Sequence, residues 1–283
     1  MYFKIGYISN GFQNHDIFDM IKIITKLGFN GLGLTLDVCH YNPFKDSERS
    51  LKRIKRNLKG NNIDTVIETG ARFLLNPWEK HEPTLVSNEE TDRTKRIDFL
   101  KKAVDVAEFL EANVVTIFSG KIYENVRKEE AFGWLTNGVS EITEYAKMKN
   151  IKIGFEPEPL MLIETLEQYY LLRKEIKYDN FGLTLDIGHV QCSEDQSIHD
   201  CIISHQNEIF NIHLTDIKNK KHIHLPLGEG DINFLDVFKA LKEIKYANIV
   251  NLELSRNSHN APSVANQSMI FIKEILKQIE GTE

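Results

Sequence analysis

The chain has 283 residues, 41% of them hydrophobic and 27% charged, as expected for a soluble globular protein about the size of one α/β barrel. Its formal net charge of −6 argues against a nucleic-acid binder that relies on a basic surface, so no nucleic-acid partner is expected. No apolar run approaches the roughly 18 residues of a membrane span.

The cysteines and the first residues of the chain indicate in which cellular compartment the protein is expected. Cys39, Cys192 and Cys201 are an odd number without CxxC spacing, which is typical of reduced chains rather than disulfide scaffolds. The first residues, MYFKIGYISN, enter a β-rich run directly and show no signal-peptide pattern. We therefore expect a cytoplasmic protein with no membrane partner, and we leave a homo-oligomer open.

Short β-rich runs alternate with helix-period segments along the chain. The β-rich runs lie at 3–8, 31–37, 63–69, 113–118, 151–156, 181–186, 209–214 and 248–254. The clearest helical segments lie at 15–28, 46–60, 91–111, 126–149, 163–176, 232–245 and 262–279. This alternation predicts an α/β protein with a single (β/α)8 TIM barrel over residues 1–283. A doubly wound open sheet is the alternative, but the Gly-rich phosphate turn typical of it is missing after the first run.

Two connections are longer than usual, and long ordered loops are often functional. The segment 70–90 carries Arg72, Phe73 and Trp78, which suit a lid over a polar substrate; the alternative is that its aromatic residues cap the barrel rim or form a dimer contact. The segment 215–231 contains histidines and the sequence GEGD. Its glycines are suited either to a phosphate contact or to a plain tight turn.

Four potential metal ligands stand at the ends of the last four β-rich runs. They are Glu156, Asp186, His213 and Glu253. In a parallel barrel the carboxyl ends of the strands converge on one mouth, and three carboxylates with an imidazole are costly to bury there without a cation. Such a ligand set suits one divalent metal, Mn²⁺ first, with Mg²⁺, Co²⁺ and Zn²⁺ as other options. The alternative is that each acid is a helix N-cap or a solvated loop residue.

Further polar residues lie close to these strand ends. His189 follows Asp186 by three positions and suits a metal ligand, a substrate donor or a partner of a carboxylate. Glu158 and His224 are candidates for substrate binding, with solvent-exposed loop residues as the alternative. Arg72 is a candidate partner for Glu158 or for an anionic or hydroxyl group of the substrate.

The order of these motifs resembles the xylose isomerase-like superfamily of sugar isomerases and epimerases, which also includes endonuclease IV-type barrels. The resemblance rests on the strand-end Glu156, the D-x-x-H of LDIGH, the HLTD after the seventh run, the GEGDI and the closing LEL. It implies that Glu156, Asp186, His213 and Glu253 hold the metal. It also implies that Glu156 and Glu253 form the acid/base pair and that His189 contacts the substrate.

The chain departs from the pattern in two places. The additional zinc-binding histidines of endonuclease IV-type members are missing from the early strand ends, where Asp37, Glu68 and Ser119 stand, with His40 slightly beyond. The arginine that epimerases commonly carry shortly after the seventh-strand histidine is also missing, and Asp216 and Lys218 stand there. The second departure puts the contacts that orient the substrate in question.

The leading hypothesis is a metal-dependent isomerase or epimerase that acts on a small sugar, a sugar phosphate or a related polyol carbonyl compound through an enediolate. A lyase or dehydratase on the same scaffold is the first alternative, since an enediolate can also expel a β-leaving group. A non-catalytic metabolite-binding protein and a nuclease are the others. The expected partner is a small carbohydrate-like molecule.

Overall fold

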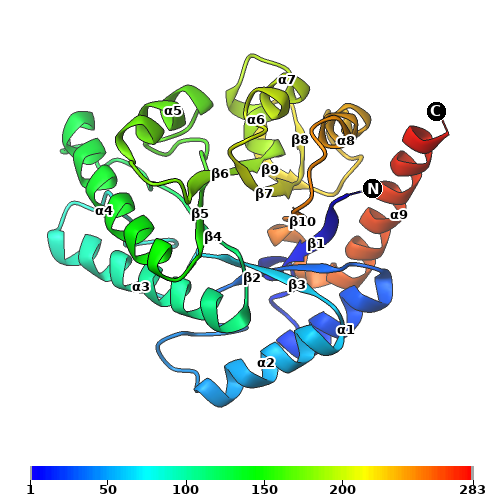
Figure 1. Cartoon of the computed structure of the whole chain (residues 1–283), viewed down its shortest axis with the longest axis horizontal. Helices are drawn as coiled ribbons and strands as arrows, with labels where there is room; N and C mark the ends of the chain where they lie inside the picture. The colour runs from blue at the N-terminus through cyan, green and yellow to red at the C-terminus, as the bar shows by residue number, and fades with distance from the viewer. Residues whose placement is uncertain (1, 282–283) are drawn as a thin grey trace.

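Eight parallel strands close into a barrel, as the sequence pattern predicts (Figure 1). The computed structural model describes residues 2–281. Around the barrel the strands follow the order β1-β10-β7-β6-β5-β4-β3-β2, and the pairing of β1 with β10 completes the ring. The barrel strands are β1 (Lys4–Ile8), β2 (Gly31–Thr35), β3 (Asp64–Glu68), β4 (Val114–Ile117), β5 (Lys152–Phe155), β6 (Phe181–Asp186), β7 (Ile209–Leu214) and β10 (Ile249–Leu252).

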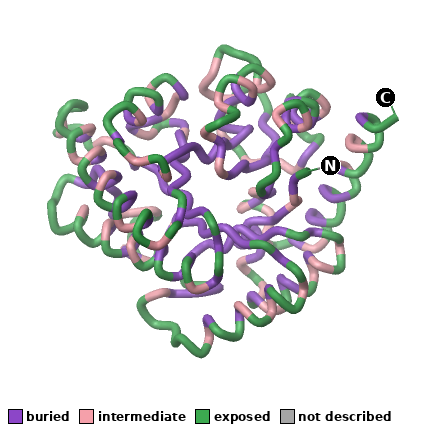
Figure 2. Tube along the Cα trace, viewed as in Figure 1, coloured by how far each residue is buried: buried purple, intermediate pink, exposed green. Residues whose placement is uncertain are grey.

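Helices surround the barrel and leave the buried strands at its centre (Figure 2). They are α1 (Ile17–Leu27), α2 (Glu48–Gly60), α3 (Glu90–Leu110), α4 (Lys128–Met148), α5 (Leu166–Glu175), α6 (Ile187–Ser193), α7 (Ile198–Ser204), α8 (Phe234–Glu243) and α9 (Ala261–Glu280). The sequence pattern predicts seven of them to within a few residues. It does not predict α6 and α7, because helices of seven residues are too short to show a repeating apolar stripe. No helix within residues 2–281 has the length and apolar composition that crossing a bilayer requires.

The first helix illustrates how the chain sets its boundaries. The Asp16 side chain accepts hydrogen bonds from the backbone N–H groups of Phe18 and Asp19, which would otherwise be unpaired at the helix start. Gly28 ends the helix with φ 97°, a left-handed conformation in which glycine carries no steric penalty. Between these caps, Met20, Ile21 and Ile24 are fully buried on the face that packs on the core.

The long segment after β7 is not the open loop that the sequence predicts. It contains an antiparallel hairpin of β8 (Asp216–Lys218) and β9 (Lys221–Leu225). His222 and His224 therefore lie on a strand, two residues apart, and share one face of it. The hairpin fixes both imidazoles relative to the barrel mouth.

The interior of the barrel contains a polar layer below its catalytic mouth. Asn211 Nδ2 donates to Thr116 Oγ1 at 3.1 Å, and Asn251 Nδ2 donates to Asn211 Oδ1 at 3.2 Å. Thr116 and Thr184 hydroxyls lie 3.1 Å apart. Gly154 makes room for this layer, since a Cβ there would lie 2.3 Å from Thr184 Oγ1. Each strand that supplies a polar residue to the layer presents its next inward position, two residues later, at the mouth.

Candidate metal centre

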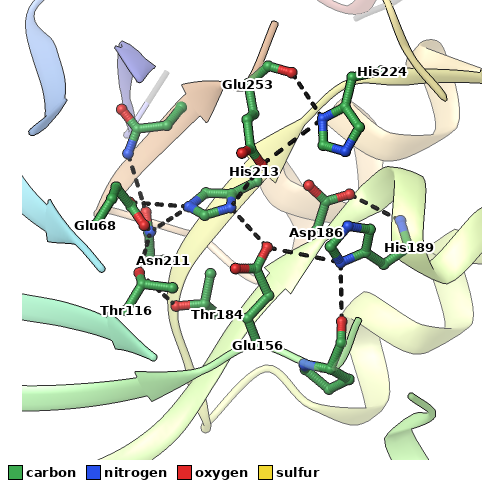
Figure 3. Close-up of polar contacts among 12 residues, drawn as sticks. Glu68, Thr116, Glu156, Thr184, Asp186, His189, Asn211, His213, His224 and Glu253 are labelled. Carbon is green, nitrogen blue, oxygen red and sulfur yellow. Dashed lines mark hydrogen bonds and ion pairs between the residues drawn. The ribbon is translucent and has the colours of Figure 1, made fainter. Parts of the chain in front are cut away.

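The four strand-end residues converge at the mouth of the barrel (Figure 3). One ligand atom from each of Glu156, Asp186, His213 and Glu253 lies within 4.8 Å of the others. Asp186 and His213 are register partners on β6 and β7. Glu156 and Glu253 stand one residue beyond β5 and β10, where their N–H groups still continue the ladder to Ile117 O and Leu214 O. The barrel geometry alone therefore brings together residues that are up to 97 positions apart.

His213 presents its two ring nitrogens to different surroundings. Nδ1 lies 2.9 Å from Glu156 Oε1 and 3.5 Å from Glu253 Oε2, so it faces the carboxylate cluster. Nε2 lies 3.0 Å from Glu68 Oε1 on the opposite side of the ring. Asn211 Nδ2 is 2.9 Å from Nε2, but its two hydrogens have acceptors in Glu68 and Thr116. We therefore assign a proton to Nε2, which donates to Glu68. In the metal-free site Nδ1 is also protonated and donates to the carboxylates, and it would lose this proton on binding a metal.

The charges of the cluster call for a cation. Burial raises the pKa of Glu156. Burial also raises the pKa of Glu253, but a hydrogen bond from His213 and the charge of His224 outweigh it and hold that pKa well below its usual range. Burial lowers the pKa of His213, yet the charges of Glu68 and Glu156 raise it well above its usual value. The carboxylates around His213 are thus stabilised by a positive charge between them. A divalent ion would supply that charge.

Asp186 gives the clearest sign that the donor set fits a metal. Its Oδ1 accepts from the N–H of His189 at 2.9 Å and caps α6, while its Oδ2 is buried and has no hydrogen-bond partner. A buried carboxylate oxygen without a partner is costly in a folded protein. Three carboxylates and one imidazole are suitable ligands for Mn²⁺, Mg²⁺, Co²⁺ or Zn²⁺.

Glu68 belongs to this site, although the sequence pattern marks it only as a strand-end residue and gives it no role. It ends β3, it is 5% exposed, and it joins His213 to Asn211. Among the other early-strand residues, Asp37, His40 and Ser119 do not line the cavity. The signal that could have identified Glu68 is its position at a strand end equivalent to those of the four candidate ligands.

Three histidines form a second group that could hold a metal ion, next to the first. The nitrogens of His189, His222 and His224 lie within 4.8 Å of one another. Nδ1 of His189 lies 3.0 Å from Pro157 O and Nδ1 of His224 lies 3.1 Å from Glu253 O, so each donates to a carbonyl. Among the described residues Nε2 of His189 has no partner, whereas Nε2 of His224 lies 3.0 Å from His222 Nε2. Such backbone contacts orient metal-binding and substrate-binding imidazoles alike. Burial lowers the pKa of His222 to about 4, helped by the charges of His189 and His224.

A cavity of about 680 Å³ opens above the centre. All four residues predicted to bind substrate line it, namely Arg72, Glu158, His189 and His224. Burial raises the pKa of Glu158 to about 7. Burial lowers the pKa of His189, but the charges of Asp186, Glu156 and Glu158 raise it to about 9. Polar groups that can donate or accept therefore surround the position a substrate would occupy.

The segment 70–90 lies on the catalytic side of the barrel. Arg72, Lys80 and His81 line the cavity, and His81 Nδ1 is 2.6 Å from Gly70 O, which ties the segment to the end of β3. Leu75 is buried, whereas Trp78 is 90% exposed and points away from the protein interior. The position fits a lid, but the Trp78 ring does not cover the cavity in this conformation and does not cap the rim.

The GEGD segment has a structural role, so it is not a phosphate site. The N–H groups of Gly228 and Gly230 both donate to Asp216 Oδ2, at 2.9 and 2.8 Å. The fully buried Asp216 carboxylate also accepts from the N–H of Ile217 and of Ile232. Asp216 therefore fixes the end of the hairpin. Lys218 is exposed and does not line the cavity.

Comparisons with known proteins agree with the fold and with the resemblance seen in the motifs. A family model described as a xylose isomerase-like TIM barrel matches residues 21–275. An uncharacterized protein of Methanocaldococcus jannaschii is 31% identical over 97% of this chain and 88% of its own length. The L-ribulose-5-phosphate 3-epimerase UlaE of Shigella flexneri is 20% identical over 87% of this chain and 84% of its own length.

Solved structures share the whole barrel. A D-tagatose 3-epimerase-like protein superposes with a TM-score of 0.82 at 24% identity and covers 99% of both chains. The probable 3-DHS dehydratase AsbF from Bacillus anthracis superposes with a TM-score of 0.76 at 18% identity, over 95% of this chain and 98% of that one. At these identities the likeness establishes the fold.

Proposed function

The chain belongs to the xylose isomerase-like TIM barrel family, and from that premise we propose that it is a metal-dependent sugar isomerase or epimerase. The substrate would be a small sugar, a sugar phosphate or a related polyol carbonyl compound. The observation that carries the proposal is the convergence of Glu156, Asp186, His213 and Glu253 around the unpartnered Asp186 oxygen. The similar proteins include an L-ribulose-5-phosphate 3-epimerase, a D-tagatose 3-epimerase-like protein and a probable 3-DHS dehydratase, which supports chemistry of this kind.

These four residues would hold one divalent ion, for which we propose Mn²⁺ first. When bound, the ion would polarise the substrate carbonyl and stabilise the enediolate oxygens. His213 would contribute Nδ1, since its Nε2–H donates to Glu68. Asp186 would contribute Oδ2, because its Oδ1 caps α6.

Glu156 and Glu253 suit the proton transfers of such a reaction. They come from β5 and β10, which are separated in the barrel by β6 and β7, so they approach the substrate position from different sides. Their surroundings push their pKa values apart, with Glu156 raised and Glu253 lowered. One of the two would take the proton from carbon and the other would return one, from the opposite face in an epimerase or to the neighbouring carbon in an isomerase.

The histidines and Glu158 would position the substrate. His189 and His224 are each held by a backbone carbonyl and line the cavity, where His224 Nε2 also lies 3.0 Å from His222 Nε2. Glu158 lines the same side. These groups would hold hydroxyls next to the reacting carbon, and the exposed Lys218 would take no part.

A dehydratase is the second candidate, because the same enediolate can expel a β-hydroxyl. The structural similarity to a probable 3-DHS dehydratase supports this alternative. A non-catalytic metabolite-binding protein is the third.

Metal analysis and isotope exchange would test the proposal. The metal content of the purified protein is measured first, and the loaded protein is then incubated in D₂O with ketoses, sugar phosphates and inososes. We expect about one divalent ion per protein chain. We also expect deuterium at the carbon next to the carbonyl and an epimer or isomer as the product. A dehydrated product would favour the second candidate, and absence of exchange with every compound would contradict enediolate chemistry.

A further inference from the structure

Basic side chains gather on one part of the cavity mouth. Arg72 and Lys80 come from the segment after β3, and Arg256 comes from the turn after β10. The metal-binding residues lie at β5, β6, β7 and β10. The cavity therefore has an acidic floor at the candidate metal centre and basic groups above the β3 side and beside Glu253.

These cations form no ion pair with any residue that the structure describes. Among residues 2–281, neither Arg72, Lys80 nor Arg256 forms an ion pair, although Glu82, Glu158 and Glu253 line the same cavity. Arg72 Nη1 is buried and has no hydrogen-bond acceptor. A guanidinium nitrogen in that state is unfavourable until an acceptor arrives.

The cations also repel one another. Burial lowers the pKa of Lys80, the nearby charges of Arg72 and Arg256 lower it further, and the charges of Glu158 and Glu253 offset this only in part. A cluster of like charges at a cavity wall is stabilised when an anion binds, and arginine pairs well with the oxygens of phosphate and carboxylate groups.

We propose that Arg72, Lys80 and Arg256 form an anion subsite that holds the phosphate or carboxylate end of an open-chain sugar. The inference rests on the proposed function, because it assumes that the carbonyl end of this sugar lies at Glu156, Asp186, His213 and Glu253. It narrows the substrate class from any small polyol carbonyl compound to an anionic one. The phosphate and the carboxylate share the same chemistry at this subsite, and the substrates tested distinguish them.

The first experiment compares three substrates of the metal-loaded protein by deuterium exchange: a free ketopentose, a ketopentose 5-phosphate and a ketohexuronate. We expect kcat/KM for one of the two anionic sugars to exceed that of the free ketose by about 10-fold to 100-fold, as contacts to a charged group allow. The substitutions Arg72→Gln and Arg256→Gln should each reduce that ratio by about 10-fold, mainly through KM. The matched control is Arg49→Gln on the exposed surface of α2, which should leave the ratio unchanged.

The second experiment measures binding without turnover. Inorganic phosphate is titrated into the Mg²⁺-loaded protein by calorimetry, with the wild type, Arg72→Gln and Arg49→Gln compared. We expect Arg72→Gln alone to weaken phosphate binding by about 10-fold or more. Phosphate held only by the metal would not respond to this substitution.

The two experiments separate the subsite from the reaction. If all three sugars exchange with similar kcat/KM and phosphate binds equally to Arg72→Gln, the subsite is wrong while the proposed function stands. If no sugar exchanges but phosphate binding depends on Arg72, the subsite stands and the proposed function fails. Unchanged thermal unfolding of Arg256→Gln, which alters an exposed side chain, would exclude misfolding as the cause of any loss.

Discussion

The Nε2 atom of His213 lies 3.0 Å from Glu68 Oε1, and this contact determines which ring nitrogen faces the candidate metal centre. A carboxylate that accepts from the far nitrogen of an imidazole fixes the tautomer and makes the near nitrogen a better ligand. Glu68 would thus strengthen a metal bond without touching the metal.

The substitution Glu68→Gln should lower metal affinity by about 10-fold to 100-fold, because the amide keeps the shape of the side chain but loses its charge. Competition with a fluorescent chelator measures the affinity directly. Glu82→Gln, which alters another carboxylate of the same cavity, serves as the control. Equal affinity in the Glu68 variant and the wild type would show that the contact does not support the ligand.

The substitution Glu253→Gln should abolish proton exchange, by a factor of about 100 or more, since the amide cannot accept a proton. Circular dichroism should stay unchanged because the carboxyl ends of barrel strands serve chemistry rather than stability. Glu158→Gln is the informative comparison: it should lower kcat/KM without abolishing exchange. Full exchange in the Glu253 variant would rule out the acid/base assignment.

Removal of the metal should destabilise the protein as well as inactivate it. A ligand at 100 times its dissociation constant stabilises the folded state by about 2.7 kcal/mol, so adding Mn²⁺ to chelated protein should raise Tm. Asp186→Asn should lose most of that rise, because asparagine can still cap α6 through Oδ1 but replaces the unpartnered Oδ2 with an amide nitrogen. A wild-type response of Tm in this variant would exclude Asp186 as a ligand.

The substitution Asp216→Asn should lower the free energy of unfolding by about 3 kcal/mol, since an amide NH₂ would face two backbone N–H groups in a buried place. Urea denaturation measures this change. Asp231→Asn removes an exposed carboxylate that accepts one hydrogen bond, from Asn219 N, and should cost about 1 kcal/mol or less. If the two variants were equally stable, Asp216 would not be what holds the GEGD turn.

The substitution Trp78→Ala should leave the unfolding free energy of the monomer within about 0.5 kcal/mol of the wild type, because the ring is 90% exposed. If the segment 70–90 closes over substrate, KM should rise or kcat should fall. If the ring instead forms a contact between copies, sedimentation should show a change in oligomeric state with kinetics intact. Measuring the kinetics and the sedimentation of the same preparation distinguishes the lid from the contact between copies.

The barrel and the convergence of four candidate ligands at its mouth could be predicted because both follow from local patterns. Each of the strands β5, β6, β7 and β10 is an apolar run with a candidate ligand at or next to its end, and parallel strands bring such ends together. The same period of two also places Asn211 two residues before His213 and Asn251 two residues before Glu253, which is how the polar layer could have been found.

Other features depend on contacts between distant parts of the chain. Nothing near Asp216 in the sequence indicates that its acceptors serve Gly228 and Gly230, which lie 12 and 14 positions away. The pairing of His222 with His224 at one face of β9 depends on a hairpin whose strands have three and five residues, too short for a clear alternating pattern. That Arg72 and Lys80 form no ion pair could be seen only in the folded structure, where the side chains around them are placed.

The two-residue spacing in β7 has a consequence for how this protein can change over time. Because Asn211 and His213 alternate with outward-facing residues, deletion of one residue at the start of the strand, before Asn211, would turn both toward the helices at once. The interior support and the ligand would be lost in a single event. Insertions and deletions should therefore be tolerated in segments such as 70–90 and in the β8–β9 hairpin tip, and excluded from the strands. New substrates would then be acquired by remodelling the loops while the centre stays as it is.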